Sequence, residues 1–156
     1  MAHILRMPNP SDYITMSTWV ADAYECIRWA GPKLSFPLNA KNLSRLLAGP
    51  ETTSYLLCHS DHPEDPLGFG QLVKRVPAGM HLARIIVSPA SRGGGLGRIL
   101  CERLIERTNA VSEVRQLTLN VYRDNRQAMA LYLSLGFTEI PGQSRQGLVA
   151  MHKTLR

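Results

Sequence analysis

The residues with the clearest chemical potential form a glycine-rich stretch directly after an apolar segment. Residues 85–98 read IIVSPASRGGGLGR, so four glycines lie between Arg92 and Arg98. Glycines let a loop curl with its backbone N–H groups pointing inward, and a helix that opens there adds the positive end of its dipole. Guanidinium groups bind phosphate in a fork geometry. The stretch therefore predicts a cradle for a diphosphate.

Spacing separates the known classes of phosphate-binding loop. A Walker loop requires a lysine after its last glycine, and none follows here. A dinucleotide-binding G-x-G-x-x-G pattern that begins at Gly93 would need glycine where Arg98 stands. The pattern that fits is R-x-x-G-x-G, formed by Arg92, Gly95 and Gly97. A turn that only connects a strand to a helix remains the alternative explanation.

A second pattern lies further along the chain, on a predicted helix. It reads N-x-x-A-x-x-L-Y-x-x-x-G-F and comprises Asn125, Ala128, Leu131, Tyr132, Gly136 and Phe137. Tyr132 carries a phenol with an unperturbed pKa of about 10, which makes it a candidate proton donor. The alternative is a half-buried aromatic residue on an amphipathic helix.

The apolar patterning predicts the elements that must position these residues. We expect strands at residues 4–7, 53–59, 67–76, 80–87, 115–122, 137–140 and 148–153. The segments 67–76 and 80–87 should form an antiparallel hairpin. The crossover through the glycine loop should make the strands at 80–87 and 115–122 parallel.

Capping and breaking residues predict about four helices. The first begins with Ser11 or Asp12 as its N-cap, buries a stripe of Ile14, Val20, Tyr24 and Ile27, and ends at Gly31-Pro32. A short second helix is capped by Asn39 and ends at Gly49-Pro50. The third follows the glycine loop and buries Leu96, Ile99, Leu100, Leu104 and Ile105. The fourth begins with a capping box, Asp124-x-x-Gln127, and buries Ala128, Leu131, Tyr132 and Leu135. The predicted fold is α+β, with a mixed, mostly antiparallel sheet of about seven strands and the order β-α-α-β-β-β-α-β-α-β-β.

The two patterns together resemble the GNAT superfamily of N-acetyltransferases, in particular its small bacterial single-domain members. The first pattern extends to V-x-P-x-x-R-x-x-G-x-G, because Val87 and Pro89 precede Arg92. With their strands the two patterns cover about residues 80–140, and the element order outside them agrees with the family fold. The resemblance implies a single GNAT domain over residues 1–156. It also implies an enzyme that transfers the acetyl group of acetyl-CoA to a primary amine of a small molecule, amino acid or peptide, by direct attack in a ternary complex.

The resemblance also assigns the cofactor site. The glycine loop would bind the pyrophosphate through its backbone amides, and the strand before it would pair with the pantetheine arm. A β-bulge commonly separates that strand from the next one and opens a slot for the thioester. The cofactor-binding residues implied in this way are Ile85, Ile86, Val87, Arg92, Gly93, Gly94, Gly95, Leu96, Gly97, Arg98, Asn120, Asn125 and Tyr132.

Acetyl transfer sets the chemical requirements of such a site. A protonated amine cannot attack a thioester, and the leaving thiolate, whose conjugate acid has a pKa of about 8.5, needs a proton. A strand N–H at Ile86 or Val87 would stabilise the negative oxygen, and Tyr132 would donate the proton to sulfur. Many family members carry a glutamate base six residues before the V-x-P valine, where this chain has His81. Histidine has a suitable unperturbed pKa, so His81 is the candidate base; an exposed histidine without a role, a water chain to Glu25, or no dedicated base are the alternatives.

The acceptor amine should lie against the link between the first two helices, residues 29–38. In the family fold this link borders the acceptor pocket, so Trp29 and Phe36 are the candidate substrate-binding residues, with a role as core anchors as the alternative. No metal is expected, because the Cys58-His59-x-x-His62 segment lacks a second pair of ligands.

Composition limits the remaining function classes. The 156 residues carry a net charge of +6, and the whole excess lies in residues 81–156. A basic half favours an anionic partner, either a nucleic acid or a phosphate-bearing small molecule. Only 6% of residues are aromatic and no nucleic-acid motif is visible, which disfavours a nucleic-acid-binding module. A coenzyme A-binding sensor that has lost catalysis is the main alternative. We expect a cytoplasmic protein without a membrane partner, because its three cysteines are scattered and it has neither a signal-peptide pattern nor a long apolar run. The family resemblance also implies a possible homodimer, since family members often pair.

Overall fold

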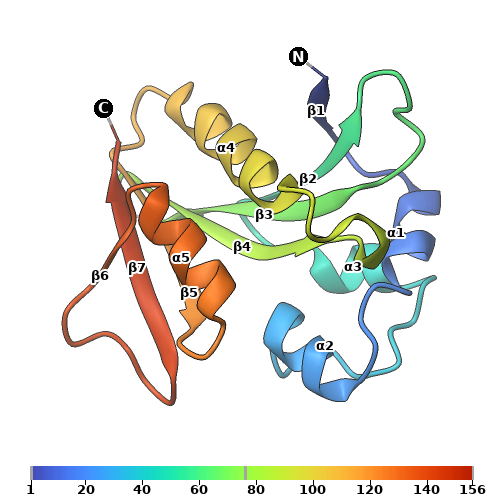
Figure 1. The fold of residues 1–156 in the computed structure, drawn as a ribbon, viewed down its shortest axis with the longest axis horizontal. Helices are drawn as coiled ribbons and strands as arrows, with labels where there is room; N and C mark the ends of the chain where they lie inside the picture. Colours follow the sequence, from blue (N-terminus) through green and yellow to red (C-terminus); the bar gives the residue numbers. More distant parts are fainter. Residues whose placement is uncertain (1, 76, 156) are drawn as a thin grey trace.

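The computed structural model describes residues 2–75 and 77–155. Its strands form one seven-stranded sheet in the order β1-β2-β3-β4-β5-β7-β6 (Figure 1). The strands are β1 His3–Arg6, β2 Thr52–His59, β3 Gly68–Arg75, β4 Gly79–Val87, β5 Gln116–Tyr122, β6 Thr138–Glu139 and β7 Leu148–Thr154. The helices are α1 Pro10–Met16, α2 Ala23–Ala30, α3 Leu43–Leu47, α4 Leu96–Asn109 and α5 Arg126–Ser134, with a short 3₁₀ turn at Pro89–Ser91.

The pairing of the strands confirms the predicted mixed α+β sheet. Strands β4 and β5 run parallel, and the other five neighbouring pairs are antiparallel. The hairpin of β3 and β4 is present; Val76, which we assigned to its first strand, lies outside the described residues. The strand predicted at 137–140 is shorter in the structure, where β6 comprises only Thr138 and Glu139.

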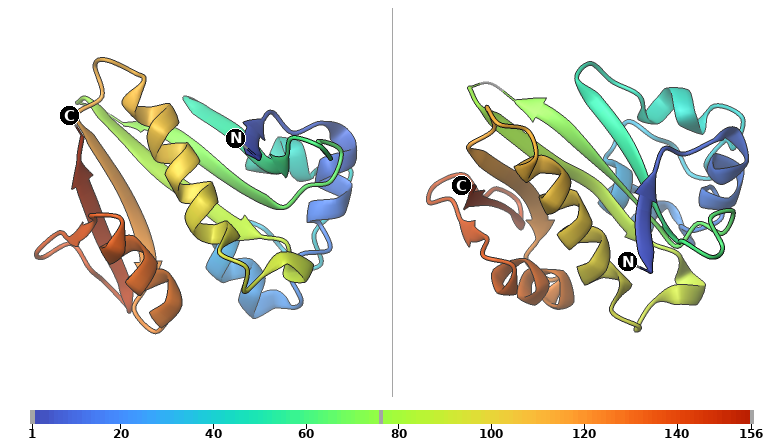
Figure 2. Two further views of the ribbon diagram at one scale, coloured as in Figure 1. Left: turned by 45° about the horizontal axis from the view of Figure 1, so that its top comes forward. Right: turned by 90° about the horizontal axis from the view of Figure 1, so that it is seen from above.

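Helices cover both faces of the sheet and define two apolar clusters (Figure 2). Helices α4 and α5 pack on one face, where Leu100, Leu104 and Tyr132 meet the inward side chains of β5 and β7. Helices α1, α2 and α3 pack on the other face, against β2, β3 and the end of β4. The buried side chains of β2, β3 and β4 are divided between the two clusters, whereas those of β5 and β7 enter only the first cluster. The five predicted contact residues of α4 all lie in or against the first cluster.

The first predicted helix is wrong in its length and in its buried face. The chain forms two helices there, because the segment between Met16 and Ala23 is irregular and Asp22 starts α2 by accepting a hydrogen bond from the Glu25 N–H. Of the predicted stripe, Ile14, Tyr24 and Ile27 are exposed. Val20 of the stripe is buried between the two helices, and their buried apolar residues are Met16 of α1 and Cys26 and Ala30 of α2. The predicted stripe assumed one continuous helix, so its spacing does not describe the buried faces of two separate short helices. Gly31 ends α2 as predicted.

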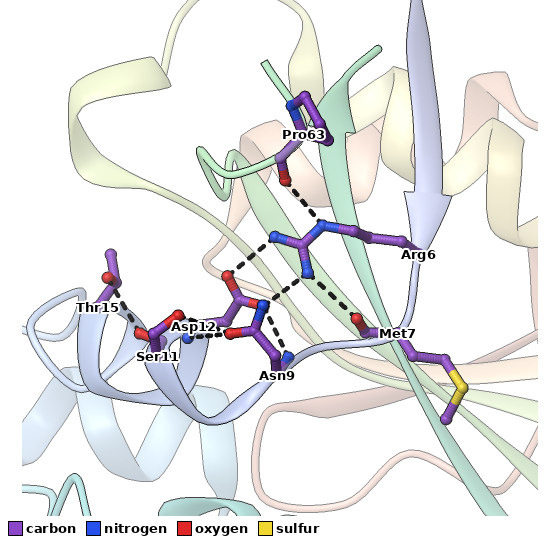
Figure 3. Close-up of polar contacts among 7 residues, drawn as sticks. All are labelled: Arg6, Met7, Asn9, Ser11, Asp12, Thr15 and Pro63. Carbon is purple, nitrogen blue, oxygen red and sulfur yellow. Dashed lines mark hydrogen bonds and ion pairs between the residues drawn. The ribbon is translucent and has the colours of Figure 1, made fainter. Parts of the chain in front are cut away.

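Three N-caps also differ from those we predicted. Helix α1 is capped by Asn9, whose side chain accepts from the Asp12 N–H while the Asp12 carboxylate accepts from the Asn9 N–H (Figure 3). Asp12 is thus the third residue of a capping box instead of the cap itself. Asn39 accepts from Lys41 in a turn, and α3 starts later, after Asn42. The capping box at Asp124 does not form, because Asn125 caps α5.

An ion pair ties α1 to the end of β1. The Arg6 guanidinium donates two hydrogen bonds to the Asp12 carboxylate, at 2.6 and 3.0 Å, and a third to the Pro63 carbonyl (Figure 3). Burial alone would raise the pKa of Asp12, but the hydrogen bonds from Arg6 and from the Asn9 N–H outweigh it and lower that pKa. The ion pair therefore fixes how the chain turns from the sheet into its first helix.

No helix in the described part of the chain has the length and apolar character needed to cross a bilayer.

Candidate active site

Strands β4 and β5 separate halfway along their length, and this separation creates the site. Their parallel pairing covers Gly79 to Leu82 of β4 and Gln116 to Leu119 of β5, with no further pair in the described residues. On its other edge β4 carries a β-bulge, because Arg84 and Ile85 together stand opposite the single residue Gly70 of β3. Arg84 has a φ of 52°, in the left-handed region, which bends the strand. The bulge and the splayed strands agree with the family resemblance.

A cavity of about 450 Å³ occupies the opening between the two strands, and we call it the slot. Its walls come from the end of α2 with the following Gly31-Pro32, the middle of β4, the end of β5 and the first turns of α5. Figure 1 shows α2 and α5 at either side of the place where β4 and β5 diverge. The slot thus connects the two faces of the sheet.

The glycine loop lies between the end of β4 and α4, as predicted. Gly93 and Gly95 have positive φ values of 86° and 80°, which explains glycine at these two positions. Gly94 and Gly97 do not have positive φ, and an added Cβ would meet no atom closer than 3.8 Å at either position. The backbone therefore does not require glycine at these two positions.

The N–H groups of this loop are available to a ligand. None of the backbone N–H groups of residues 93–98 donates a hydrogen bond to another described residue. Six adjacent donors at the N-terminus of a fourteen-residue helix form a site for an anion. The flanking arginines lie close by: Arg92 donates to the Val87 carbonyl, and Arg98 donates to Ser134 of α5.

The edge of β4 that faces the slot also carries unpaired backbone groups. The Ser88 N–H donates to Leu67, on the β3 side, at 2.9 Å. Since N–H groups alternate between the two edges of a strand, the Val87 N–H points away from β3, to the edge that β5 leaves unpaired beyond Leu82. An extended chain with amide groups could hydrogen-bond along this edge as a replacement for the missing strand.

Tyr132 lies on α5 and lines the slot. Its ring is buried against Phe137, with ring centroids 6.0 Å apart, and its hydroxyl forms no hydrogen bond with the described residues. Burial, and secondarily the neighbouring Cys101, raises the pKa of Tyr132. The hydroxyl therefore keeps its proton at neutral pH and is free to give it to a group in the slot.

His81 lines the slot from β4. One ring nitrogen, Nδ1, lies 2.7 Å from the Thr118 hydroxyl of β5. Burial lowers the pKa of His81 to about 4, and the positive charge of Arg75 contributes. The ring is therefore neutral at pH 7 and carries a lone pair, but it is a much weaker base than a free histidine.

Both predicted asparagines line the slot. Asn120 is exposed near the end of β5, past the last residue that pairs with β4. Asn125 has a structural task as well, since its side chain caps α5 by accepting from the Ala128 N–H at 3.2 Å.

The two predicted acceptor residues lie in different places. Trp29 lines the slot, donates from Nε1 to the Arg84 carbonyl at 2.8 Å, and packs against Phe69. Phe36 is 39% exposed and does not line the slot, so its contact with the acceptor stays a prediction. Only the start of the 29–38 link, as far as Pro32, lines the slot. Glu25, the alternative base, does not line it either.

Three arginines of the slot, Arg28, Arg75 and Arg84, were missed in the sequence. Arg84 is the bulge residue, and Arg75 is at the end of β3. No sequence pattern marked Arg84 as a residue of the slot. Alternation could not have placed it, because the bulge shifts the register of β4 at that residue.

Comparison with known proteins agrees with this geometry. Residues 16–137 match the sequence profile of the acetyltransferase (GNAT) family. The Escherichia coli protein named Peptidyl-lysine N-acetyltransferase YjaB is 35% identical over 81 residues, which are 52% of this chain and 47% of that protein. A 5-NmdU N-acetyltransferase of Pseudomonas phage PaMx11 is 36% identical over 89 residues, or 56% of this chain and 60% of that protein. The chain spans about half the length of the curated relatives it matches.

A solved structure shares the whole architecture. Spermidine N-acetyltransferase from Vibrio cholerae, in complex with CoA and spermine, has a TM-score of 0.78 to this chain. The match covers 98% of this chain and 95% of the other at 16% identity, so it concerns the fold. The family profile spans most of the chain and includes both the glycine loop and Tyr132. The chain belongs to the acetyltransferase (GNAT) family.

Proposed function

We propose that this chain is an N-acetyltransferase that transfers the acetyl group of acetyl-CoA to a primary amine of a small molecule, an amino acid or a peptide. The observation that carries the proposal is the slot itself. It lies at the point where β4 separates from β5, beyond a loop with six available N–H donors, and it holds a protonated tyrosine. Family membership and relatives named as N-acetyltransferases support the same activity.

The residues around the slot fit acetyl-CoA. The N–H groups of residues 93–98 would bind its diphosphate, and the flanking Arg92 and Arg98 add positive charge. The open edge of β4, residues 85–87, would hydrogen-bond the amides of the pantetheine arm. When bound, acetyl-CoA supplies a thioester whose acetyl group passes to the amine nitrogen while the C–S bond breaks and the sulfur gains a proton.

Two side chains handle the protons in this proposal. Tyr132 holds its proton at Oη, because burial raises its pKa, and donates it to the leaving sulfur. The Val87 N–H stabilises the carbonyl oxygen as it becomes negative. His81 receives the proton that the amine loses. Since the pKa of His81 is about 4, the imidazole cannot keep this proton and passes it to solvent.

Replacing Tyr132 tests this assignment. Tyr132→Phe keeps the ring and removes the acidic proton, so we expect kcat to fall about 100-fold, the lower part of the range for general acid catalysis. The KM for acetyl-CoA and its affinity in calorimetry should change less than threefold. Release of the coenzyme A thiol with the best acceptor amine gives the rate. Tyr55→Phe, on β2 and outside the slot, is the matched control and should have wild-type rates.

Other outcomes point to other functions. An unchanged kcat in Tyr132→Phe would remove the tyrosine from the mechanism. A wild-type protein that binds acetyl-CoA but acetylates no amine would be a coenzyme A-binding domain without catalysis.

A further inference from the structure

The charge of the slot is strongly one-sided. Three arginines line it, Arg28, Arg75 and Arg84, and none of its described lining residues is an aspartate or a glutamate. A primary amine is itself a cation near neutral pH. The positive charge of the slot therefore repels an acceptor that carries further cationic groups besides the amine that is acetylated.

One of the three arginines is already neutralised. The Arg28 guanidinium lies 2.6 Å from the Asp124 carboxylate and 4.2 Å from the centre of the Tyr122 ring. This ion pair joins α2 to the loop before α5 and satisfies both charges. The excess charge of the slot therefore comes from Arg75 and Arg84.

Arg84 is a half-buried cation whose partners within the described residues are all neutral. Its guanidinium donates to the Ala30 carbonyl and to Oε1 of the buried Gln71, at 3.3 and 3.0 Å. Burial lowers the pKa of Arg84, and no carboxylate lies near enough to offset that effect. A guanidinium has five N–H donors, and only three are used in these bonds. A charge removed from water in this way is stabilised by an anionic partner.

Arg75 extends the positive wall from the end of β3. Its side chain is exposed, and it makes no ion pair with any described residue. It is close enough to His81 to disfavour the protonated imidazole. Arg75 adds positive charge beside His81 and Arg84 adds it at the bulge, so an anionic group in the slot is attracted to this wall.

We propose that the acceptor is a small primary amine that carries a carboxylate or a phosphate group in the same molecule, and that Arg84 and Arg75 bind this anionic group. The proposal rests on the proposed acetyltransferase function and narrows its acceptor. The anion orients the molecule so that its amine points into the slot, toward Tyr132. Polyamines, such as the spermine in the Vibrio cholerae structure, lack an anion and would leave both arginines unpaired.

Matched pairs of amines test the proposal through thiol release from acetyl-CoA. One arm compares amino acids with their carboxamides, and a second compares O-phosphoethanolamine with ethanolamine, with spermidine alongside. We expect the anionic member of at least one pair to have a kcat/KM at least tenfold above its neutral counterpart and above spermidine. The arm that responds identifies the anion as carboxylate or phosphate.

Three variants locate the effect. Arg84→Gln and Arg75→Gln should each lower kcat/KM for the anionic acceptor at least tenfold, mainly through its KM, without altering the affinity for acetyl-CoA. Arg75 is exposed, so Arg75→Gln should fold and still tests the proposal if the variant at the half-buried Arg84 does not fold. Arg45→Gln, on α3 and outside the slot, should match the wild type.

Three outcomes overturn the proposal: faster acetylation of neutral or cationic members, no acetylation of any anionic member, or equal rates in wild type and Arg75→Gln. Calorimetric binding of acetyl-CoA in the same preparation separates these outcomes from a failure of the acetyltransferase assignment itself.

Discussion

Tyr132 and His81 approach the slot from opposite faces of the sheet, and burial keeps both side chains uncharged at neutral pH. Tyr132 packs in the cluster under α4 and α5, and Leu82, the neighbour of His81, enters that same cluster. His81 therefore points to the other face, because successive side chains of a strand alternate. Burial raises the pKa of the phenol and lowers the pKa of the imidazole, so at neutral pH the phenol holds its proton and the imidazole a free lone pair, while each shift makes the group a weaker acid or base.

The lowered pKa of His81 makes the unfolding free energy of the protein depend on pH, even without a substrate. The imidazole has a pKa of about 4 in the folded chain and about 6.5 when unfolded, so the unfolded state binds more protons between these values. Stability then rises with pH through this window and falls as the pH is lowered below 6.5. Between pH 7 and pH 5 the loss due to His81 should be about 2 kcal/mol.

Urea denaturation of wild type and His81→Gln at several pH values measures this loss. The variant lacks the titrating group, so the difference in unfolding free energy between the two proteins should shrink or reverse toward pH 5. Parallel curves for the two proteins would mean that His81 titrates normally and that the slot around it is hydrated.

Among the elements, the passage from β1 into α1 depends on one carboxylate. Asp12 is 2% exposed, holds two hydrogen bonds from Arg6 and completes the capping box of α1 (Figure 3). Asp12→Ala removes the cap contact and leaves the Arg6 guanidinium half-buried without its partner. We expect the unfolding free energy to fall by about 2–4 kcal/mol, measured by urea denaturation.

The exposed Asp65 provides the matched control for that variant. Asp65→Ala should change the unfolding free energy by less than about 0.5 kcal/mol, as is usual for surface substitutions. An equally small effect of Asp12→Ala would show that α1 docks on the sheet through its apolar contacts alone.

At the scale of the whole molecule, the sheet is two sub-sheets joined at half of one parallel pair. Strands β1 to β4 carry α1, α2 and α3, whereas β5, β7 and β6 carry α5, and α4 lies on the face where they meet (Figure 2). The slot is the place where the two parts diverge. Its walls therefore come from segments as distant in sequence as Trp29, Arg84 and Tyr132.

This architecture explains which features could be predicted from the sequence. Strong local signals gave correct predictions: the glycines at 93–97, the apolar face of α4 and the alternation of Leu117, Leu119 and Val121. The split between α1 and α2 was missed, because Val20 and Ile27 continue a helical spacing across a break that tertiary contacts impose. Arg84 was missed for a related reason, because its position depends on a bulge that has no periodic pattern in the sequence.

Titration calorimetry of two variants at one position tests whether the glycine loop and the slot bind acetyl-CoA. Gly94 has space for a side chain, so substitutions there should leave the fold intact. Gly94→Glu places a negative charge among the N–H groups of the loop, whereas Gly94→Gln adds a neutral side chain of the same size. We predict one-to-one micromolar binding of acetyl-CoA to the wild type, at least tenfold weaker binding to Gly94→Glu, and less than a threefold change for Gly94→Gln. No saturable binding to the wild type, or equal affinities of the Glu and Gln variants, would contradict the account.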